Sequence, residues 1–383
     1  MDFSLSAGQE AFLDAVRAFV RDRVTPAAAR IDETATFPRQ LVDEASRLSL
    51  TGVTIPQALG GGGHDYVAYA MAMEAVSFGS ATLAVILSVN NSLVAEPLHE
   101  HGTEPQKTRW LRPLATGRAL GAFALSEAQA GSDAANQQTV ARPDGNQFML
   151  RGTKVWVALG EVADVAMVFA RTEPGSTRSR GISAFLVPLG LPGITRKPSD
   201  SLGVRGLGCV DLTFDDVRVD TSAPLGEPGR GFAIAMRALE GGRIAIAAQA
   251  LGVGRAALDE AIAYAREREV FGQPLGEFQA VQFQLADLAT DLAAARMLTW
   301  RAASLRGGAS RVAYEAAMAK LHASEAAHRA ADRAMQILAS AGYRRGSTIE
   351  RLFRDVRAAE IYQGTSEVQR MVIAEHLLET RMG

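Results

Sequence analysis

Near its C-terminus the chain reads Ile361-Tyr362-Gln363-Gly364-Thr365-Ser366-Glu367-Val368-Gln369-Arg370. The third residue of this segment, Gln363, carries a carboxamide, which has no lone pair basic enough to accept a proton near neutral pH. Gln363 therefore cannot act as a general base. The segment lies at the end of a long region of helical periodicity, and the rest of the architecture can be read outward from it.

The region that contains this segment, residues 229–383, has the pattern of a helix bundle. Apolar residues recur on single faces of three expected helices: Leu251, Leu258 and Ile262; Leu285, Leu288 and Leu292; Met335 and Leu338. An alanine-rich run at 316–334 precedes the last of these groups. Long alanine-rich helices with narrow apolar stripes are typical of helix bundles.

The middle of the chain, residues 118–228, has the pattern of strands. Two short apolar runs, 165–170 and 182–187, are bounded by glycine and proline. Apolar and polar residues alternate over 210–215, as expected for a half-buried strand. Because no helical pattern separates these runs, the region does not read as a Rossmann sheet of βαβ units.

The N-terminal region, residues 1–117, is again helical. Phe12, Val16 and Phe19 recur at helical spacing, a further helix is expected from Tyr66 to about residue 78, and the apolar run 83–98 predicts a buried helix. The predicted fold class is therefore mostly α with a central β domain.

Composition narrows the class of protein. The 383 residues are 48% hydrophobic and 21% charged, with a net charge of −2, so we expect a globular protein that binds no nucleic acid. The single cysteine, Cys209, suits a reducing compartment. No signal peptide and no apolar run of about 20 residues is evident, so we expect a cytoplasmic protein without a membrane span. His99 and His101 lack further ligands nearby, and no metal site is expected.

Five further segments accompany the one at 361–370. They are Phe123-Ala124-Leu125-Ser126-Glu127-Ala128-Gln129-Ala130-Gly131-Ser132-Asp133, Gly152-Thr153-Lys154-Val155-Trp156-Val157, Leu202-Gly203-Val204-Arg205-Gly206, Gly242-Arg243 with Arg268-Glu269-Val270-Phe271-Gly272-Gln273-Pro274-Leu275, and Gln336-Ile337-Leu338 with Gly342-Tyr343 and Arg354-Asp355. In this order and spacing they resemble the motifs of the acyl-CoA dehydrogenase family, and the chain is most similar to its short-chain (butyryl-CoA) members. The resemblance implies a helical bundle, a β-barrel domain and a C-terminal four-helix bundle.

The resemblance also implies a cofactor, FAD, and a shared site in a homo-oligomer, commonly a tetramer. The implied FAD contacts are Phe123, Leu125, Ser126, Ser132, Trp156, Val157, Ala158, Arg268, Phe271, Gln279, Gln336, Leu338, Ala339, Ser340, Thr365, Ser366 and Glu367. Those to the substrate are Ser132, Glu240, Arg243 and Gly364. Arg268, Gln279 and the backbone of 336–340 would serve the cofactor of a neighbouring subunit.

Three departures from the family pattern concern the reacting centre. Gln363 stands where the family has the glutamate that removes the α-proton. Some relatives place that glutamate just before the arginine of the Gly242-Arg243 pair, but here the position is glycine. Glu240 is a weak candidate for a substitute base. It lies two residues before position 242 and therefore points to nearly the opposite face of the helix. The alternative interpretation is a solvent-facing acid or an acid near the CoA. Ala158 stands where a threonine or serine hydroxyl usually bonds the flavin.

The expected function follows from the resemblance. It is FAD-dependent α,β-desaturation of a short-chain acyl-CoA thioester, with electrons passing to an electron-transferring flavoprotein. Two alternatives stay open because of Gln363. One is another flavin reaction on a CoA or carrier-protein thioester, such as enoyl reduction or β-elimination. The other is a catalytically silent flavoprotein that binds CoA esters.

Overall fold

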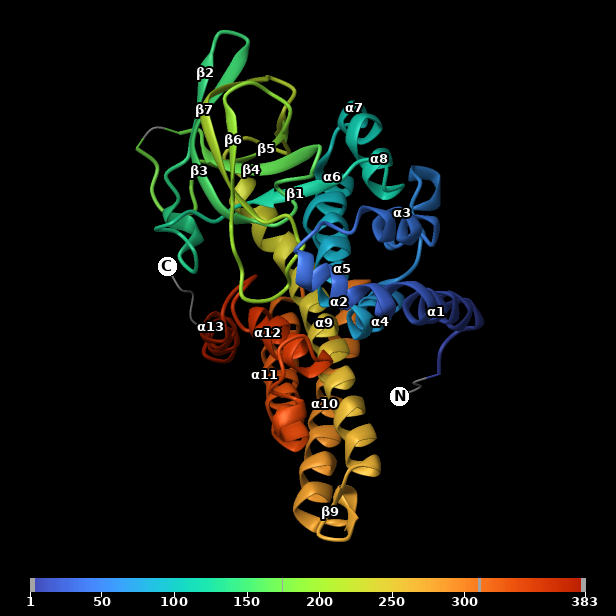
Figure 1. Ribbon diagram of the computed structural model, residues 1–383. Coiled ribbons are helices and arrows are strands. Elements are labelled where there is room, and N and C mark those ends of the chain that lie inside the picture. The colour runs from blue at the N-terminus through green and yellow to red at the C-terminus, as the bar shows by residue number, and fades with distance from the viewer. Residues whose placement is uncertain (1–3, 174, 309–310, 380–383) are drawn as a thin grey trace.

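The computed structural model describes residues 4–173, 175–308 and 311–379. A group of N-terminal helices packs beside a β domain, and three long C-terminal helices extend away from both (Figure 1). The predicted fold class, mostly α with a central β domain, is confirmed.

The N-terminal part is a series of short helices wrapped around one buried segment. Its elements are α1 (Ala7–Phe19), a π-helical turn (Val20–Val24), α2 (Thr25–Thr34), α3 (Arg39–Arg47), α4 (Tyr66–Gly79), α5 (Ala81–Ser88), a π-helical segment (Val89–Ala95), α6 (Glu96–His101), α7 (Glu104–Gln106), a second π-helical turn (Lys107–Leu111) and α8 (Arg112–Ala115). The helices expected at 66–78 and 83–98 are both present.

The segment Ala81–His101 is one continuous helical stretch and contains the buried helix expected at 83–98. By length and mean composition it could cross a membrane, although polar residues interrupt its apolar run. The polar residues that interrupt it, such as Asn90 and Asn91, are buried and bond neighbouring backbone groups: Asn90 Nδ2 donates to Thr51 O at 2.8 Å. The apolar window lies fully inside the fold, as expected of a core helix.

The β domain holds one eight-stranded sheet. Its strands are β1 (Gly121–Ala124), β2 (Val140–Asp144), β3 (Gln147–Val157), β4 (Val165–Arg171), β5 (Ile182–Pro188), β6 (Ile194–Pro198), β7 (Val210–Asp220) and β8 (Pro224–Leu225). Their order is β6-β7-β3-β2-β4-β5-β8, with β1 beside β4. β3 is bulged against β7 between Lys154 and Val157, which turns Trp156 out of the regular ladder.

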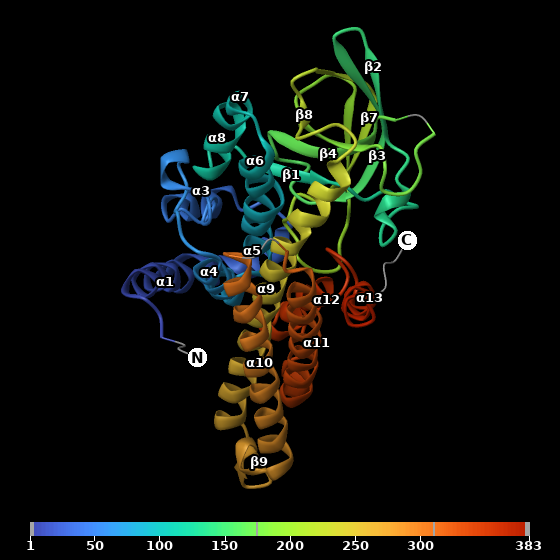
Figure 2. The ribbon, with the colours of Figure 1, turned by 180° about the vertical axis from the view of Figure 1, so that it is seen from behind.

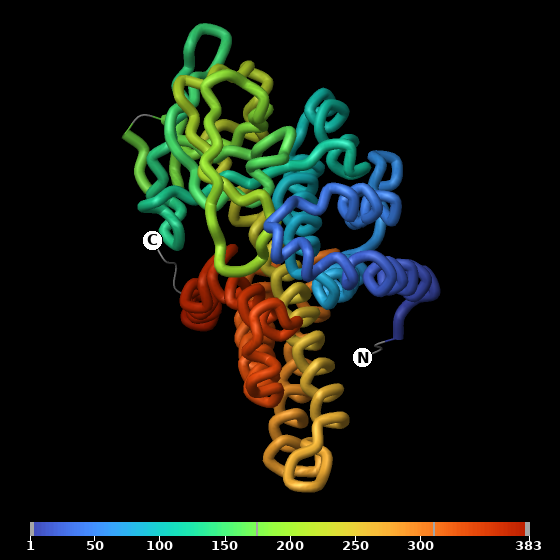
Figure 3. Tube along the Cα trace, viewed as in Figure 1, coloured from blue at the N-terminus to red at the C-terminus, as the bar shows by residue number. Residues whose placement is uncertain are grey.

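The C-terminal part is a helical column. It comprises α9 (Gly231–Glu267), the two-stranded ribbon β9 (Glu269–Val270) and β10 (Gln273–Pro274), α10 (Gln279–Arg306), α11 (Ala313–Leu338), α12 (Thr348–Ala359) and α13 (Ser366–Leu377). The trace shows α9 descending from the β domain to the ribbon and α10 returning (Figure 3). Gly252 and Gly254 lie inside α9, where a Cβ would press on α4 and on Leu292 and Ala327, so this G-x-G serves helix packing.

Candidate active site

Lys154 anchors the loop that follows β1, residues 123–130, which we call the Lys154 loop. Its side chain is fully buried, and its Nζ donates to Glu127 Oε1 at 2.7 Å, to Gln137 Oε1 at 2.8 Å and to the Leu125 carbonyl at 3.0 Å. Two segments that the sequence shows separately, 123–133 and 152–157, are thus joined by one ammonium group. All three N–H donors of Lys154 have acceptors, so the loop backbone is fixed.

Glu127 completes this anchor. Its carboxylate accepts from Lys154 and from the backbone N–H groups of Gln138 (2.6 Å) and Thr139 (2.9 Å). Burial opposes ionisation, but Lys154 and these hydrogen bonds outweigh it and lower the pKa of Glu127 to about 2. The carboxylate is therefore a structural anion and is unsuited to accept a proton during turnover.

Trp156 presents an aromatic surface beside the Lys154 loop. It sits at the β-bulge with φ +55°, and its side chain is 61% exposed. The adjacent Val155 N–H donates to Ser126 O at 2.9 Å, which places the bulge against the loop. A large exposed indole next to loop backbone suits a flat polar-edged ring such as a flavin. Ala158 is half-buried two residues further on and offers only a methyl group.

The segment 361–366, which we call the Gln363 loop, joins α12 to α13. Gln363 and Gly364 both have positive φ, +53° and +97°. The Gly364 carbonyl accepts from Lys320 Nζ on α11 at 2.7 Å and from Gln369 Nε2 on α13 at 2.8 Å. Thr365 caps α13, and Tyr362 donates to Gln249 on α9. The unusual backbone is therefore held from three helices.

Unsatisfied polar atoms gather around the Gln363 loop. Among the described residues, eight buried side-chain nitrogen or oxygen atoms lack a hydrogen-bond partner, and four of them belong to Gln363 (Oε1), Ser366 (Oγ), Gln369 (Oε1) and Arg243 (Nε). Buried polar groups are nearly always paired in native proteins, so such a concentration points to a ligand site.

Gly242 on α9 lies directly against the side chain of Gln363. A Cβ at position 242 would overlap Gln363 Oε1 and come within 2.9 Å of Leu93 Cδ2. The two positions at which the resemblance described under Sequence analysis places the base therefore face one another here. Neither holds a carboxylate.

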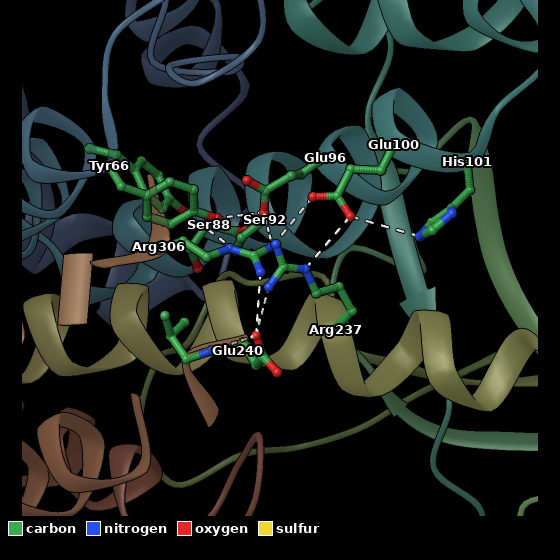
Figure 4. A network of polar contacts seen from close by, with 11 residues as sticks. Tyr66, Ser88, Ser92, Glu96, Glu100, His101, Arg237, Glu240 and Arg306 are labelled. Atoms are coloured by element: carbon green, nitrogen blue, oxygen red, sulfur yellow. Dashed lines mark hydrogen bonds and ion pairs between the residues drawn. The ribbon is translucent and has the colours of Figure 1, made fainter. Parts of the chain in front are cut away.

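Glu240 is not solvent-facing, which corrects that expectation. It is 2% exposed and lies in the polar network of Figure 4, where it bonds Arg237 at 2.9 Å, Arg306 at 3.4 Å and the Val312 N–H at 3.2 Å. Arg306 comes from α10, and its pairing could not be read from the local helix pattern. With its oxygens shared among these donors, Glu240 is poorly placed to serve as the base.

Arg243 and Lys320 form a buried pair of cations beside the Gln363 loop. Arg243 is 7% exposed and Lys320 is fully buried. Burial and the nearby Arg243 lower the pKa of Lys320 to about 7. Sequence reasoning missed Lys320, although a lysine inside an alanine-rich apolar stripe was a usable signal. It missed Gln369 as well.

A second link joins the β domain to the helices that carry the Gln363 loop. Val204 has φ +53°, and its N–H donates to Asp355 Oδ1 at 2.5 Å. Gly203 packs so closely on the Arg354 carbonyl that a Cβ would overlap it. The segments 202–206 and 354–355 are therefore one contact. Burial raises the pKa of Asp355 to about 6.

One group of the predicted cofactor residues lies far from the rest. Arg268, Phe271 and Gln279 flank the β9–β10 ribbon, at the opposite end of α9 from the β domain in both views (Figures 1 and 2). Phe271 is 97% exposed with φ +49°, and Arg268 has no ion pair among the described residues. A single chain does not bring these residues to Trp156.

The remaining predicted residues lie at helix ends. Gln336 and Leu338 end α11, and Ala339 follows with φ +51° and ψ −131°, a conformation suited to glycine; Ser340 is exposed. Ser132 is exposed after the Lys154 loop. Thr365, Ser366 and Glu367 begin α13, with Ser366 buried and Glu367 exposed. Their roles stay predictions.

Comparison with known proteins gives consistent matches along the chain. Family models match residues 6–118 (acyl-CoA dehydrogenase, N-terminal domain), 122–217 (middle domain) and 229–378 (C-terminal domain). The mitochondrial short-chain specific acyl-CoA dehydrogenase of Bos taurus is 48% identical over 95% of this chain and 88% of its own length.

Solved structures agree. Butyryl-CoA dehydrogenase from Megasphaera elsdenii superposes with a TM-score of 0.96 at 39% identity, covering 99% of this chain and 100% of that one. A glutaryl-CoA dehydrogenase from Mycobacterium smegmatis, solved in complex with FADH2, gives a TM-score of 0.93 at 31% identity, covering 99% and 96%.

Proposed function

Because the chain belongs to the acyl-CoA dehydrogenase family of enzymes, whose members bind FAD, we propose that it binds FAD and a short-chain acyl-CoA thioester at the Gln363 loop. The observation that carries the proposal is the loop itself. Its two positive-φ residues and the clamp from Lys320 and Gln369 are present. Half of the unpaired buried side-chain nitrogen and oxygen atoms in the described part of the chain lie in or beside it. The loop is built to meet a ligand.

Flavin binding and thioester binding are assigned to two different regions of the site. The Lys154 loop and Trp156 would hold the flavin, which when bound can accept a hydride from the β-carbon of the acyl group. The backbone N–H of Gln363 would bond the thioester carbonyl, which stabilises negative charge on that oxygen and acidifies the α-proton. That donor belongs to the main chain, so the glutamine side chain does not remove it.

Proton removal is the step that this chain does not support well. Gln363 cannot accept the proton, Gly242 has no side chain, and Glu240 is occupied by arginines. The loss of a general base costs about 10²- to 10⁴-fold in rate. We therefore propose that desaturation, with electrons passing to an electron-transferring flavoprotein, is slow in this protein. These same features favour, as the second candidate, chemistry on the thioester that needs no base.

The distance between the two sets of cofactor residues supports an oligomer. Arg268, Phe271 and Gln279 would reach the FAD of another copy, most simply within a homotetramer, because they lie at the far end of α9. The single cysteine supports a cytoplasmic location.

The test is an anaerobic titration of the flavin-loaded protein with butyryl-CoA, followed by the visible flavin band. Wild type should bind and bleach slowly. Gln363→Glu should bleach about 10²- to 10⁴-fold faster, because it restores the base. Absence of any spectral response to butyryl-CoA in both proteins would overturn the proposal. Bleaching of the wild type as fast as the variant would show that another group takes the proton.

A further inference from the structure

The region around Gln363 has more buried positive charge than the protein neutralises. Arg243 is more than nine-tenths buried, its Nε has no acceptor, and within the described residues its guanidinium makes neither an ion pair nor a hydrogen bond. Lys320, whose pKa is about 7, is a cation in its protonated form and then uses one of its three donors, on the Gly364 carbonyl. Isolated buried charges are costly and are normally paired.

The carboxylates within electrostatic range are already engaged elsewhere. Those that act on Arg243 and Lys320 are Glu240, Glu360, Glu325 and Glu367. Glu240 is bonded to Arg237 and Arg306, Glu360 to His328 and Arg357, and Glu325 to Arg370. Glu367 is exposed to solvent. None of them is an ion-pair partner of either cation.

A glutamate at position 363 would supply the missing negative charge, and this chain has a neutral amide instead. The terminal amide of Gln363 can turn by half a rotation, which exchanges its acceptor for a donor. The free donors are then Arg243 Nε, two on the protonated Lys320 and the amide of Gln363. They outnumber the unpaired oxygens of the same region, Gln369 Oε1 and Ser366 Oγ. The group that fits such a set is an anion with two oxygens.

We propose that the ligand itself brings this anion, as a carboxylate on the α-carbon of the acyl thioester, and that the protein decarboxylates this substrate. The inference rests on the proposed function, because it takes the Gln363 loop as the place where the α-carbon lies. A carboxylate at the α-carbon would occupy the space next to residue 363, where a glutamate would repel it.

The reaction explains why no base is required. The bond between the α-carbon and the carboxylate carbon breaks, CO2 leaves, and the electron pair of that bond becomes the enolate of the thioester. The backbone N–H of Gln363 stabilises the enolate oxygen. The enolate then takes one proton from water and yields the unsubstituted acyl thioester. The reaction consumes no oxidant and no reductant.

Binding is measured first, by calorimetric titration of the flavin-loaded protein with 2-carboxybutyryl-CoA, butyryl-CoA and 2-methylbutyryl-CoA. The carboxylated thioester should bind at least about tenfold more tightly than the two neutral ones, since buried charge pairs of this kind couple strongly. Gln363→Glu should reverse that order. Equal affinities in the wild type, or no change in Gln363→Glu, would overturn the proposal.

The cations are tested with Arg243→Met and Lys320→Met, with Arg255→Met as the matched control on the exposed side of α9. Each of the first two should lose the preference for the carboxylated ligand, and the control should keep it. Because Arg243→Met could fail to fold, the far-ultraviolet circular dichroism of every variant shows which ones are folded. Lys320→Met provides a second test of the cations if Arg243→Met is not folded. Retention of the preference in folded Lys320→Met would contradict the role given to it.

Turnover is followed by mass spectrometry of the thioester and by release of ¹³CO2 from carboxyl-labelled 2-carboxybutyryl-CoA. Release of CO2 and formation of butyryl-CoA before the flavin bleaches is the expected result, because the bleaching by butyryl-CoA is slow. Tight binding without CO2 release would overturn the decarboxylation. The two proposals can fail separately. A flavin response to butyryl-CoA without any preference for the carboxylated thioester would contradict only this inference. No response to any thioester would contradict the proposed function.

Discussion

The Lys154 loop and the Gln363 loop are both clamped by a buried lysine, but the two lysines have opposite surroundings. Lys154 meets a carboxylate and two further acceptors, so its charge is compensated within the protein and the loop backbone is fixed before any ligand binds. Lys320 meets one carbonyl and faces another buried cation. The Lys154 loop is therefore held in place by interactions within the protein. The Gln363 loop keeps uncompensated charge and unpaired atoms at the place where a ligand would bind.

The largest expected effect comes from breaking the compensated pair. Lys154→Met leaves Glu127 buried without its cation and should destabilise the protein by about 3–5 kcal/mol. Urea unfolding of the flavin-loaded protein measures this, and flavin retention should fall with it. Arg151→Met on the same strand, whose side chain is 66% exposed, is the control and should change stability by less than about 0.5 kcal/mol. A similar loss in both variants would contradict the contrast.

The contact between Val204 and Asp355, which joins the regions that carry the two loops, should depend on pH. The pKa of Asp355 is about 6 in the fold against an ordinary value of 3.8, so between those pH values the folded protein holds a proton that the unfolded chain has released. Stability should therefore fall as pH rises from 4 to 6, by up to about 3 kcal/mol.

Asp355→Asn cannot titrate but can still accept from Val204. Relative to wild type it should gain stability across that range, measured by chemical denaturation at pH 4, 5, 6 and 7. Glu33→Gln, which alters an exposed acid on α2, should follow the wild-type profile. A difference between Asp355→Asn and wild type that does not vary with pH would show that Asp355 ionises normally.

A smaller effect is expected at Ala339, whose φ of +51° and ψ of −131° favour glycine. Ala339→Gly should stabilise the protein by about 1 kcal/mol, because the strain relieved exceeds the entropy that glycine loses on folding. Thermal unfolding provides the measurement. Ser340→Gly, at the next residue, should give no gain, and equal gains at both positions would argue against local strain.

The smallest effect on stability is expected at Lys320. Lys320→Met removes a poorly compensated cation, and Gln369 still bonds the Gly364 carbonyl, so the change should lie within about 1 kcal/mol of zero. Urea unfolding alongside Lys154→Met makes the comparison direct. A loss as large as that of Lys154→Met would mean that both loops depend on their lysines in the same way.

The sequence predicted the elements well where local patterns suffice. The helix at Tyr66–Gly79 has a simple apolar repeat, and the strands Val165–Arg171 and Ile182–Pro188 are short apolar runs bounded by turn residues. The residues of the candidate site were predicted from their positions in the motifs. Motif positions identify the residues but do not show which other residues they contact. Nothing near Glu240 indicates that Arg306, more than sixty residues later, pairs with it.

For the same reason, local patterns could not show that Lys154 meets Glu127 or that Val204 meets Asp355. These links depend on which segments the tertiary fold brings together. The unpaired state of Arg243 is harder still to predict from the sequence, because it depends on the position of every side chain around the guanidinium.

The overlap between positions 242 and 363 limits the mutational paths open to this chain. A side chain added at 242 would meet the terminal amide of Gln363, so residue 363 would have to turn its side chain away or be shortened before a carboxylate from α9 could fill that space. A chain with Gln363 opposite Gly242 has a carboxylate at neither position. Such a chain persists under selection only for an activity that needs no base there.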